Sequence, residues 1–389
     1  MDFNPFDHSF QSDPYPTYRW LRDEAPVYYN PHLDFWALSR FEDVLAAVLD
    51  TATYTSTKGV ALEDDGQGAA KSMIHMDPPD HTRMRKLISK RFTPRQIAEL
   101  ETTVRTLAKE LARGLDGRSE FDVVQDYSAL LPASVISVML GIPQSQHDNV
   151  RKWTDDYLTR PEDRIDQTVD SREAETKLIG LAYTYATQRR AAPNDDIMSL
   201  LVTMEFDGKP LTDADVIGMS MLLISGGHET TSKLIANGVR LLGRHPDQRD
   251  ALIADPELMP QAVEELLRYT SPTQYMTRTT TRDVTVHDTV IPEGSKVALL
   301  FGSANRDPRE FSRPDEFDIF RPRSRMLAFG RGAHVCLGAA VARLETRIAL
   351  QEFLAEVPDY EVDESAITYM HSGNVQGPTS MPLRVLARA

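Results

Sequence analysis

The most informative stretch of this 389-residue chain reads Phe329-Gly330-Arg331-Gly332-Ala333-His334-Val335-Cys336-Leu337-Gly338 and holds its only cysteine. Three glycines lie close to that cysteine, and the run from Leu337 to Glu345 has the apolar periodicity of a helix. Unpaired N–H groups and the helix dipole at the start of a helix favour an anion. We therefore expect a lowered pKa and a thiolate at Cys336.

A single thiolate limits the kinds of site that Cys336 can form. One cysteine cannot form an intramolecular disulfide, and zinc or iron–sulfur sites need several protein ligands. It can be the one axial ligand of a haem, whose other four ligands come from the porphyrin. The alternative is a buried structural cysteine, the commoner fate of a lone thiol. The stretch alone leaves both interpretations open.

A second stretch predicts a long helix. Thr212-Asp213-Ala214-Asp215 has the spacing of a capping box, and the apolar run that follows continues to about Leu242, before Gly243 and His245-Pro246. About 30 residues at 1.5 Å each give roughly 45 Å, enough to cross a domain of this size.

The centre of this helix reads Gly226-Gly227-His228-Glu229-Thr230-Thr231. Two glycines inside a helix cost about 1 kcal/mol each relative to alanine, so we expect a compensating role. Gly226, Gly227 and Thr230 share one face, and the Thr230 hydroxyl can bond to the Gly226 carbonyl. The same face continues as an apolar stripe of Met219, Leu222, Leu223 and Leu234. The alternative is a kinked core helix that tolerates a glycine pair.

Two more patterns carry charged side chains. Asp77-Pro78-Pro79 predicts a helix start with Asp77 as the cap, and His81 and Arg85 then lie on one face of that helix. A basic surface helix is the alternative. In the helical run 263–269, Arg268 can pair with Glu264 at i,i+4 or with Glu265 at i,i+3, and the spacing alone does not choose between them.

Together these stretches resemble the motifs of the cytochrome P-450 superfamily, and they follow one another in the family's order. Phe329–Gly338 fills every defined position of F-G-x-G-x-H-x-C-x-G. Gly226–Thr231 is similar to A/G-G-x-D/E-T-T/S, with glycine where alanine is usual. Asp77–Arg85 resembles D-P-P-x-H-x-x-x-R, and Glu265–Arg268 with Phe317–Arg321 match E-x-x-R and F-D-x-x-R.

The resemblance implies a role for each matching residue. Cys336 would be the axial thiolate of haem b, and Glu229 and Thr230 the acid–alcohol pair that delivers protons to dioxygen. The propionate partners would be His81, Arg85, Arg278 and His334. Further cofactor contacts would be Phe329, Gly330, Gly227, Gly338 and Ala342. A buried structural network would join Glu265, Arg268 and Arg321. The substrate pocket would include Leu222, Leu223, Gly226, Met276 and Val375.

The expected fold is mainly α with a minor β part: the P-450 fold, a triangular helix-rich prism with a long central helix over the haem. We expect one domain, 1–389, β-rich mainly at 1–60, 278–300 and 367–389 and α-rich mainly at 78–270 and 337–354. No alternation of strand, helix and strand suggests a doubly wound sheet. Residues 58–72 are polar and without period, which predicts a mobile loop.

Composition narrows the class of protein. The chain is 41% hydrophobic and 26% charged, as ordinary globular proteins are. The net charge of −15 argues against nucleic-acid binding. No run approaches the ~20 apolar residues of a membrane anchor. The first residues do not resemble a signal peptide, and one cysteine suits a reducing compartment, so we expect a cytoplasmic protein.

The resemblance implies a monooxygenase that uses O2 to hydroxylate or epoxidise a lipophilic small molecule such as a terpenoid, steroid, fatty acid or polyketide. Because the chain has no room for a reductase domain, electrons would come from NAD(P)H through ferredoxin reductase and ferredoxin. The expected docking residues are basic: Arg83, Arg85, Lys86, Lys90, Arg91, Arg323, Arg325 and Arg331. The alternatives are a peroxide-driven peroxygenase, which would not need the acid–alcohol pair, and a haem-thiolate ligand sensor without turnover.

Overall fold

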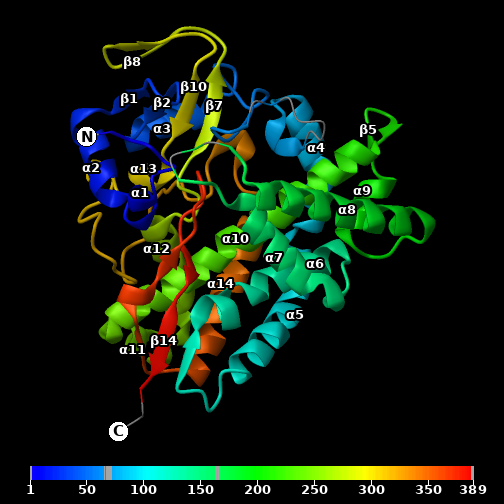
Figure 1. Ribbon diagram of the computed structural model, residues 1–389, viewed down its shortest axis with the longest axis vertical. Coiled ribbons are helices and arrows are strands. Elements are labelled where there is room, and N and C mark those ends of the chain that lie inside the picture. Colours follow the sequence, from blue (N-terminus) through cyan, green and yellow to red (C-terminus); the bar gives the residue numbers. More distant parts are fainter. Residues whose placement is uncertain (1, 65, 67–71, 163, 165, 387–389) are drawn as a thin grey trace.

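The computed structural model of the protein describes residues 2–64, 66, 72–162, 164 and 166–386 (Figure 1). It is 54% helical with a small β part, which confirms the predicted fold class. The helices are α1 His8–Ser12, α2 Tyr15–Glu24, α3 Phe41–Leu49, α4 Asp80–Ile88, α5 Pro94–Arg113, α6 Leu130–Leu140, α7 His147–Leu158, α8 Val169–Ala191, α9 Ile197–Thr203, α10 Asp213–Arg244, α11 Pro246–Ala254, α12 Met259–Thr270, α13 Phe301–Ala304 and α14 Ala339–Glu356.

The strands are short and lie mainly near the two ends of the chain and around residues 276–299. They are β1 Val27–Asn30, β2 Phe35–Leu38, β3 Tyr54–Thr55, β4 Glu120–Asp122, β5 Glu205–Phe206, β6 Lys209–Pro210, β7 Met276–Thr280, β8 Val284–Val286, β9 Thr289–Ile291, β10 Lys296–Leu299, β11 Tyr360–Val362, β12 Thr368–Tyr369, β13 Pro378–Ser380 and β14 Pro382–Val385. Two further short helical segments matter for the site, the π-helix η3 Val124–Ser128 and the 3-10 helix η6 Gly332–His334.

The largest sheet has the strand order β1-β2-β10-β7-β3 and joins the N-terminal strands to the middle of the chain. β10 pairs parallel with β2 and antiparallel with β7, and Arg278 lies opposite Val297 in the second pair. Because β7 is flanked on both sides by strands, the backbone of Arg278 is fixed inside the sheet. This places a cationic side chain at a defined position in the interior.

The helix α10 runs through the centre of the molecule (Figure 1) and packs against α6, α8, α12 and α14. Its predicted capping box is confirmed: the Asp215 N–H donates to Thr212 Oγ1 over 3.2 Å, and the Thr212 N–H donates to the Asp215 carboxylate over 3.0 Å. The helix ends at Arg244, two residues beyond the predicted end. Most of its side chains are buried, so its position is set by the surrounding core.

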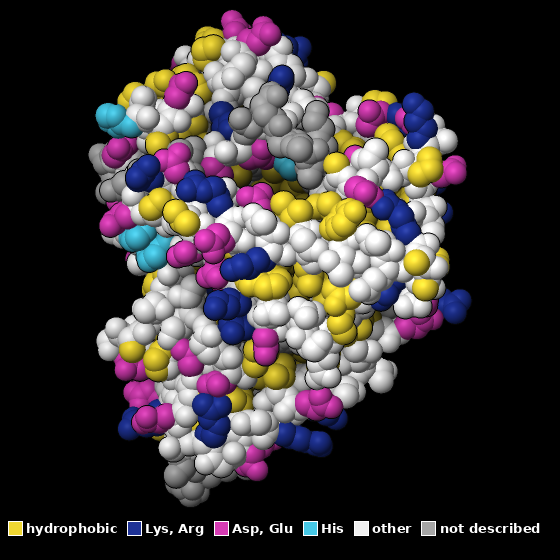
Figure 2. Space-filling model, turned by 45° about the vertical axis from the view of Figure 1, so that its right-hand side comes forward, with side chains coloured by type: hydrophobic (Ala, Val, Ile, Leu, Met, Phe, Trp, Pro, Cys, Tyr) yellow, Lys and Arg dark blue, Asp and Glu magenta, His cyan; other side chains and the backbone are white. Residues whose placement is uncertain are grey.

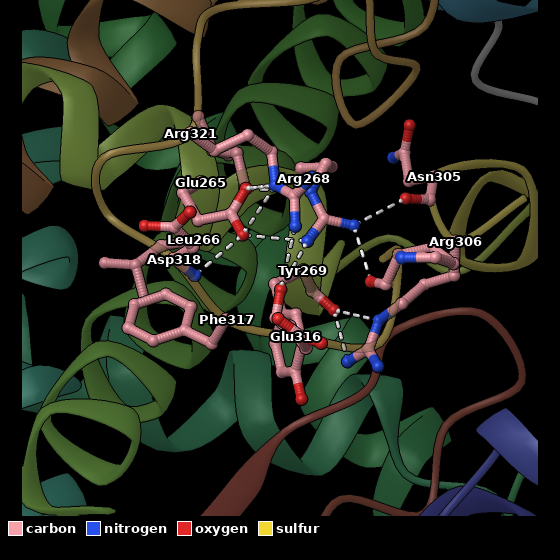
Figure 3. A network of polar contacts seen from close by, with 12 residues as sticks. Glu265, Leu266, Arg268, Tyr269, Asn305, Arg306, Glu316, Phe317, Asp318 and Arg321 are labelled. Atoms are coloured by element: carbon pink, nitrogen blue, oxygen red, sulfur yellow. Dashed lines mark hydrogen bonds and ion pairs between the residues drawn. The ribbon is translucent and has the colours of Figure 1, made fainter. Parts of the chain in front are cut away.

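A buried ion-pair network fixes the irregular segment that precedes the cysteine (Figure 3). Both Glu265 oxygens accept from Arg268 at 2.8 Å, and Arg321 Nε lies 3.1 Å from Glu265 Oε2. The i,i+3 partner is therefore correct, and Glu264 pairs instead with Arg343. The expected network of Glu265, Arg268 and Arg321 is present.

The remaining donors of this network bind backbone carbonyls rather than acids. Arg268 donates to the carbonyls of Asn305 and Pro314, while Arg321 donates to that of Ser312. Asn305 Oδ1 in turn accepts from the Leu327 N–H at 2.7 Å. The network therefore connects α12 to the chain two residues before Phe329.

Two local expectations need correction or restriction. Asp77 does not cap α4, which begins at Asp80 after Pro79 without a side-chain cap. Its carboxylate instead accepts from the Ser56 N–H at 2.9 Å and from the Thr55 hydroxyl. This longer-range pairing cannot be read from the local sequence.

Within the predicted mobile stretch 58–72, residues 65 and 67–71 lie outside the described residues. Next to them, the Asp64 carboxylate accepts from the Val60 and Gly66 N–H groups.

The ion-pair network predicts a large difference between two neighbouring glutamates. Glu265→Ala leaves two arginines buried without their acid and should lower the free energy of unfolding by roughly 3–5 kcal/mol. Glu264→Ala removes a more exposed pair and should lower it by less than about 1 kcal/mol. Urea unfolding of both variants measures the difference, and equal losses would contradict the assigned role of Glu265.

Candidate functional site

The loop around Cys336 is shaped by glycines in the left-handed region. Gly330 has φ 63° and Gly332 has φ 68°, conformations that other residues adopt only with strain. A Cβ at Gly332 would also lie 3.0 Å from Leu49 Cδ2. The turn closes when the Cys336 N–H donates to the Phe329 carbonyl over 2.9 Å. Cys336 remains accessible, so its sulfur is available to a ligand.

The expected lowering of the Cys336 pKa is wrong for the protein by itself. Although Cys336 keeps accessible surface, the protein packed around the thiol desolvates it and raises its pKa, and the opposing effects of the Gly338 N–H, Arg85 and Arg343 do not outweigh this desolvation. The helix α14 begins only at Ala339, three residues after Cys336, so the sulfur is farther from the helix start than expected. A bound metal ion supplies the missing stabilisation, because coordination deprotonates a thiol outright.

The predicted propionate partners gather beside the cysteine loop. The rings of His81 and His334 lie 4.1 Å apart, and both His81 ring nitrogens lack a hydrogen-bond partner among the described residues. Arg278 is 5% exposed, and its side chain donates to the carbonyl of the preceding Thr277. Burial lowers the pKa of Arg278 to about 10. Burial, together with Arg278, His81 and Arg85, lowers the pKa of His334 to about 3.

Among the described residues, the two arginines of this group, Arg85 and Arg278, form no ion pair with an acid, and the lowered pKa values leave His81 and His334 neutral at pH 7. Asp77 is the carboxylate that raises the pKa of both Arg278 and His81, but the Ser56 N–H and the Thr55 hydroxyl already occupy it. Buried cations without counter-charge are costly, so the site suits a ligand that carries two negative charges. Haem has two propionates and an iron that takes a thiolate, and the residues present therefore fit it.

The face of α10 that carries the glycine pair has one open position. Gly226 is accessible although it lies mid-helix, and a Cβ there would meet no atom within 4 Å. Thr230 is half-buried, and its hydroxyl donates to the Gly226 carbonyl over 2.7 Å, as predicted. A Cβ at Gly227 would instead lie 3.2 Å from Ile136 of α6. Gly226, rather than Gly227, therefore faces open space.

Glu229 lies on a different side of α10 from Thr230. It is fully buried, with Lys233 Nζ 2.9 Å from Oε2 and His228 Nδ1 3.5 Å from Oε1. Burial would raise the pKa of Glu229, but Lys233 and the other neighbours hold it well below its ordinary value. Lys233 was missed in the sequence, although a lysine four residues after a glutamate is a recognisable pairing signal.

The other predicted residues occupy the loop, the start of α14 and an apolar region. Gly338 precedes α14 and accepts from the Ala342 N–H at 2.9 Å, while the Phe329 ring lies 4.6 Å from the Arg343 guanidinium. Leu222 and Met276 are half-buried. Leu223 and Val375 are each 8% exposed. Leu223 belongs to a cluster that also contains Met73, Met84 and Met219.

The uncompensated charge of Arg278 predicts that its loss weakens haem binding without lowering the stability of the haem-free protein. Arg278→Met should weaken haem binding by about 10- to 100-fold, because a charge-assisted hydrogen bond contributes roughly 1.5–3 kcal/mol. The same change removes repulsion in the haem-free protein, whose melting temperature should not fall. Arg282→Met, at an exposed position that donates to Thr53, is the matched control. Haem titration and thermal unfolding measure both effects, and unchanged haem affinity in Arg278→Met would contradict the assignment.

Comparisons with known proteins agree with this geometry. The family model described as Cytochrome P450 matches residues 32–357. Cytochrome P450 130 of Mycobacterium tuberculosis (strain ATCC 25618 / H37Rv) is 39% identical over 388 residues, which cover 96% of this chain and 95% of that protein. The steroid C26-monooxygenase of Mycolicibacterium smegmatis is 36% identical over 370 residues, covering 94% of this chain and 91% of that protein.

Solved structures show the same fold. Cytochrome P450 CYP109Q5 from Chondromyces apiculatus aligns with a TM-score of 0.89 at 33% identity, covering 100% of this chain and 99% of its own. CYP109E1 from Bacillus megaterium, in complex with testosterone, aligns with a TM-score of 0.90 at 30% identity, covering 98% and 100%. The chain belongs to the cytochrome P450 family: it is a P450 monooxygenase whose cofactor is haem with an axial cysteine thiolate.

Proposed function

We propose that this enzyme inserts one atom of O2 into a lipophilic small molecule, with electrons from NAD(P)H delivered by ferredoxin reductase and ferredoxin. The observation that carries the proposal is the Thr230 hydroxyl. It is held by the Gly226 carbonyl at the open position of α10, next to the buried acid Glu229. Bound haem supplies the activation of dioxygen. The chain supplies binding, orientation and protons.

The cofactor would be held by its two ends. Cys336 provides the axial sulfur from a loop fixed by the Glu265 network. Arg85 and Arg278 would neutralise the propionates, and His81 and His334 would donate hydrogen bonds to them; the lack of an opposing acid beside the arginines supports that role. Phe329, Gly330, Gly338 and Ala342 line the same loop and helix start. For Gly227 we propose a packing role against Ile136 rather than direct contact.

Thr230 would donate protons on the side of the site where dioxygen reacts. Its hydroxyl has one proton, which it donates to Gly226, and two acceptor positions. Rotating away from the Gly226 carbonyl lets it donate to dioxygen or to a water. Glu229 is the adjacent titratable group on α10 and would resupply that proton. A peroxide-driven enzyme receives a protonated oxygen and has no use for this arrangement, and a sensor without turnover needs no relay.

The apolar residues near the open part of α10 favour an apolar substrate. Leu222 and Met276 provide half-buried aliphatic and thioether surface, and Leu222 packs against the buried cluster that contains Met73, Met219 and Leu223. Methionine adapts to ligands of different shape. The relative named a steroid C26-monooxygenase and the solved structure with testosterone make steroids the first class to screen among the lipophiles expected. A spectral screen of such compounds would detect substrate entry through the change in haem spin state.

Fewer of the predicted basic docking residues are free of ion pairs than the sequence suggests. Arg83 pairs with Asp80 and Asp207, Arg91 with Asp195, and Arg325 with Glu42 and Glu310. In the part of the chain that the structure describes, four exposed cations of the predicted set make no ion pair: Lys86, Lys90, Arg323 and Arg331. We propose that these four bind an acidic ferredoxin.

On the face shown in Figure 2, basic side chains are interspersed with acidic ones. No helix among the described residues is both long and apolar enough to cross a membrane. The expectations of a cytoplasmic protein without nucleic-acid binding stay predictions.

The function predicts a specific defect in Thr230→Ala. With ferredoxin, reductase and NAD(P)H, the wild type should form product in proportion to reductant consumed. The variant should consume reductant but release hydrogen peroxide, because proton delivery is no longer directed. Thr230→Ser keeps the hydroxyl and should keep the coupling. Product formed with peroxide as efficiently as with the electron carriers would favour the peroxygenase, and no product from any spectrally active ligand would favour the sensor.

The docking surface predicts that charge reversal slows reduction alone. Lys90→Glu combined with Arg331→Glu should lower the rate of reduction by an acidic ferredoxin at least several-fold at low salt, and less at high salt, because steering is screened. Lys177→Glu on α8 is the control at another exposed lysine. Stopped-flow reduction measures the rate, while substrate binding should stay unchanged. Equal reduction rates in all three proteins would refute this surface.

A further inference from the structure

The proposed relay has a gap, because Glu229 has no access to solvent. Its side chain is 0% exposed, and so is that of His228. Lys233, one turn along α10, is 2% exposed. An acid that passes protons to Thr230 must recover them after each cycle. Another group must therefore connect Glu229 with water.

Asp155 of α7 meets this requirement. Ligand atoms of Asp155, His228 and Glu229 all lie within 4.8 Å of one another. Asp155 Oδ1 is buried without a hydrogen-bond partner among the described residues, whereas the side chain as a whole is 31% exposed. Asp155 is therefore buried at one oxygen, close to Glu229, and accessible elsewhere.

Two carboxyl groups this close cannot both be ionised without strong repulsion. Burial and the charge of Glu229 raise the pKa of Asp155 well above its ordinary value, while Lys233 holds Glu229 ionised. Burial lowers the pKa of His228 to about 4, so the imidazole is neutral at pH 7. The group then contains one negative charge on Glu229, positive charges on Lys233 and Arg151, and one transferable proton on Asp155.

The charged and titratable groups around this pair come from two elements. α7 contributes Asp155 and Arg151, whose Nη1 lies 3.6 Å from Asp155 Oδ2. α10 contributes His228, Glu229 and Lys233. Arg151 Nη1 also donates to Gln125 Oε1 of η3, an exposed residue, over 3.1 Å. Polar side chains therefore run from the surface through Arg151 and Asp155 to Glu229.

Lys233 is held in place by backbone from the C-terminal region. A Cβ at Gly377 would lie 2.5 Å from Lys233 Cβ, so only a glycine fits beside the lysine stem. The carboxylates and His228 have the residue types of a metal site. However, the Lys233 ammonium already supplies the positive charge that a metal ion would bring.

We propose that Asp155 is the proton-donating partner of Glu229, through which solvent protons enter the relay, and that Lys233 is the positioning residue that holds Glu229 beside it. In the step, the O–H bond of the Asp155 carboxylic acid breaks and its proton moves to a Glu229 oxygen. Asp155 is left as a carboxylate and takes a new proton from water at its accessible side. This inference rests on the proposed function, since it names the source of the protons that Thr230 uses.

The test compares Asp155→Asn with Asp156→Asn, the neighbouring acid on the same helix. Infrared spectra of the resting holoenzyme in H2O and D2O should show the carbonyl band of a protonated carboxyl group. Asp155→Asn should lose the Asp155 part of this band, while the contribution of the buried Glu345, whose pKa burial also raises, remains; Asp156→Asn should keep the whole band. Turnover with the best substrate of the spectral screen should fall about 10- to 100-fold in Asp155→Asn with a larger solvent isotope effect and unchanged KM, whereas Asp156→Asn should match the wild type.

Asp155→Glu keeps a titratable proton and should restore both the band and most of the turnover. This variant also covers the case in which Asp155→Asn does not fold, which the reduced carbonyl spectrum detects. A wild-type level of turnover and isotope effect in folded Asp155→Asn would overturn the inference, as would a carboxyl band that persists in it at the full wild-type intensity. Absence of product from the wild type itself would instead refute the proposed function. The infrared result would then stand alone as evidence for or against the protonated Asp155.

Discussion

Unbalanced positive charge beside the cysteine loop is the constraint on which the site depends. The charge belongs to Arg85 and Arg278, which meet there beside the neutral imidazoles of His81 and His334, and the nearby carboxylate of Asp77 is already bound to Ser56 and Thr55. The sulfur of Cys336 has the complementary problem, since burial raises its pKa and opposes the thiolate. A ligand with an anionic edge and a cationic centre compensates both the positive charge of the arginines and the negative charge of the thiolate. Binding of haem and stability of this region are therefore coupled, because the groups that gain from the ligand are those that destabilise the protein without it.

The helix α10 presents an accessible side to ligands and a buried side to the core. At the glycine pair, Gly226 leaves open space and Thr230 presents its hydroxyl, so small polar ligands can approach. On an adjoining side of the helix, the side chains of Glu229 and Lys233 are buried. An ionised acid with its counter-ion is stable there only because both are present. The proton that chemistry requires at Thr230 must therefore come through the closed side, where Asp155 lies.

Local spacing explains which features could be predicted from the sequence. The capping box at Thr212 and Asp215, the bond from Thr230 to Gly226, and the face shared by His81 and Arg85 depend on three- or four-residue separations that a helix fixes. The choice of Glu265 over Glu264 did not follow from spacing; it came from the family resemblance and is explained by contacts with Arg321. The pocket residues could be placed on elements, but their substrate could not be derived.

The features that sequence reasoning missed are set by contacts between distant segments. Asp77 looked like a helix cap, yet Ser56 and Thr55 approach it from a loop that the helix pattern does not include. The pKa of Cys336 was misjudged because the helix start was expected next to the sulfur and burial was not counted. Asp155 lies 74 positions before Glu229, and no periodicity relates α7 to α10. Local pattern therefore identifies the groups that act on the ligand, whereas the groups that tune their charge require the folded structure, because desolvation and pairing depend on every segment that packs around them.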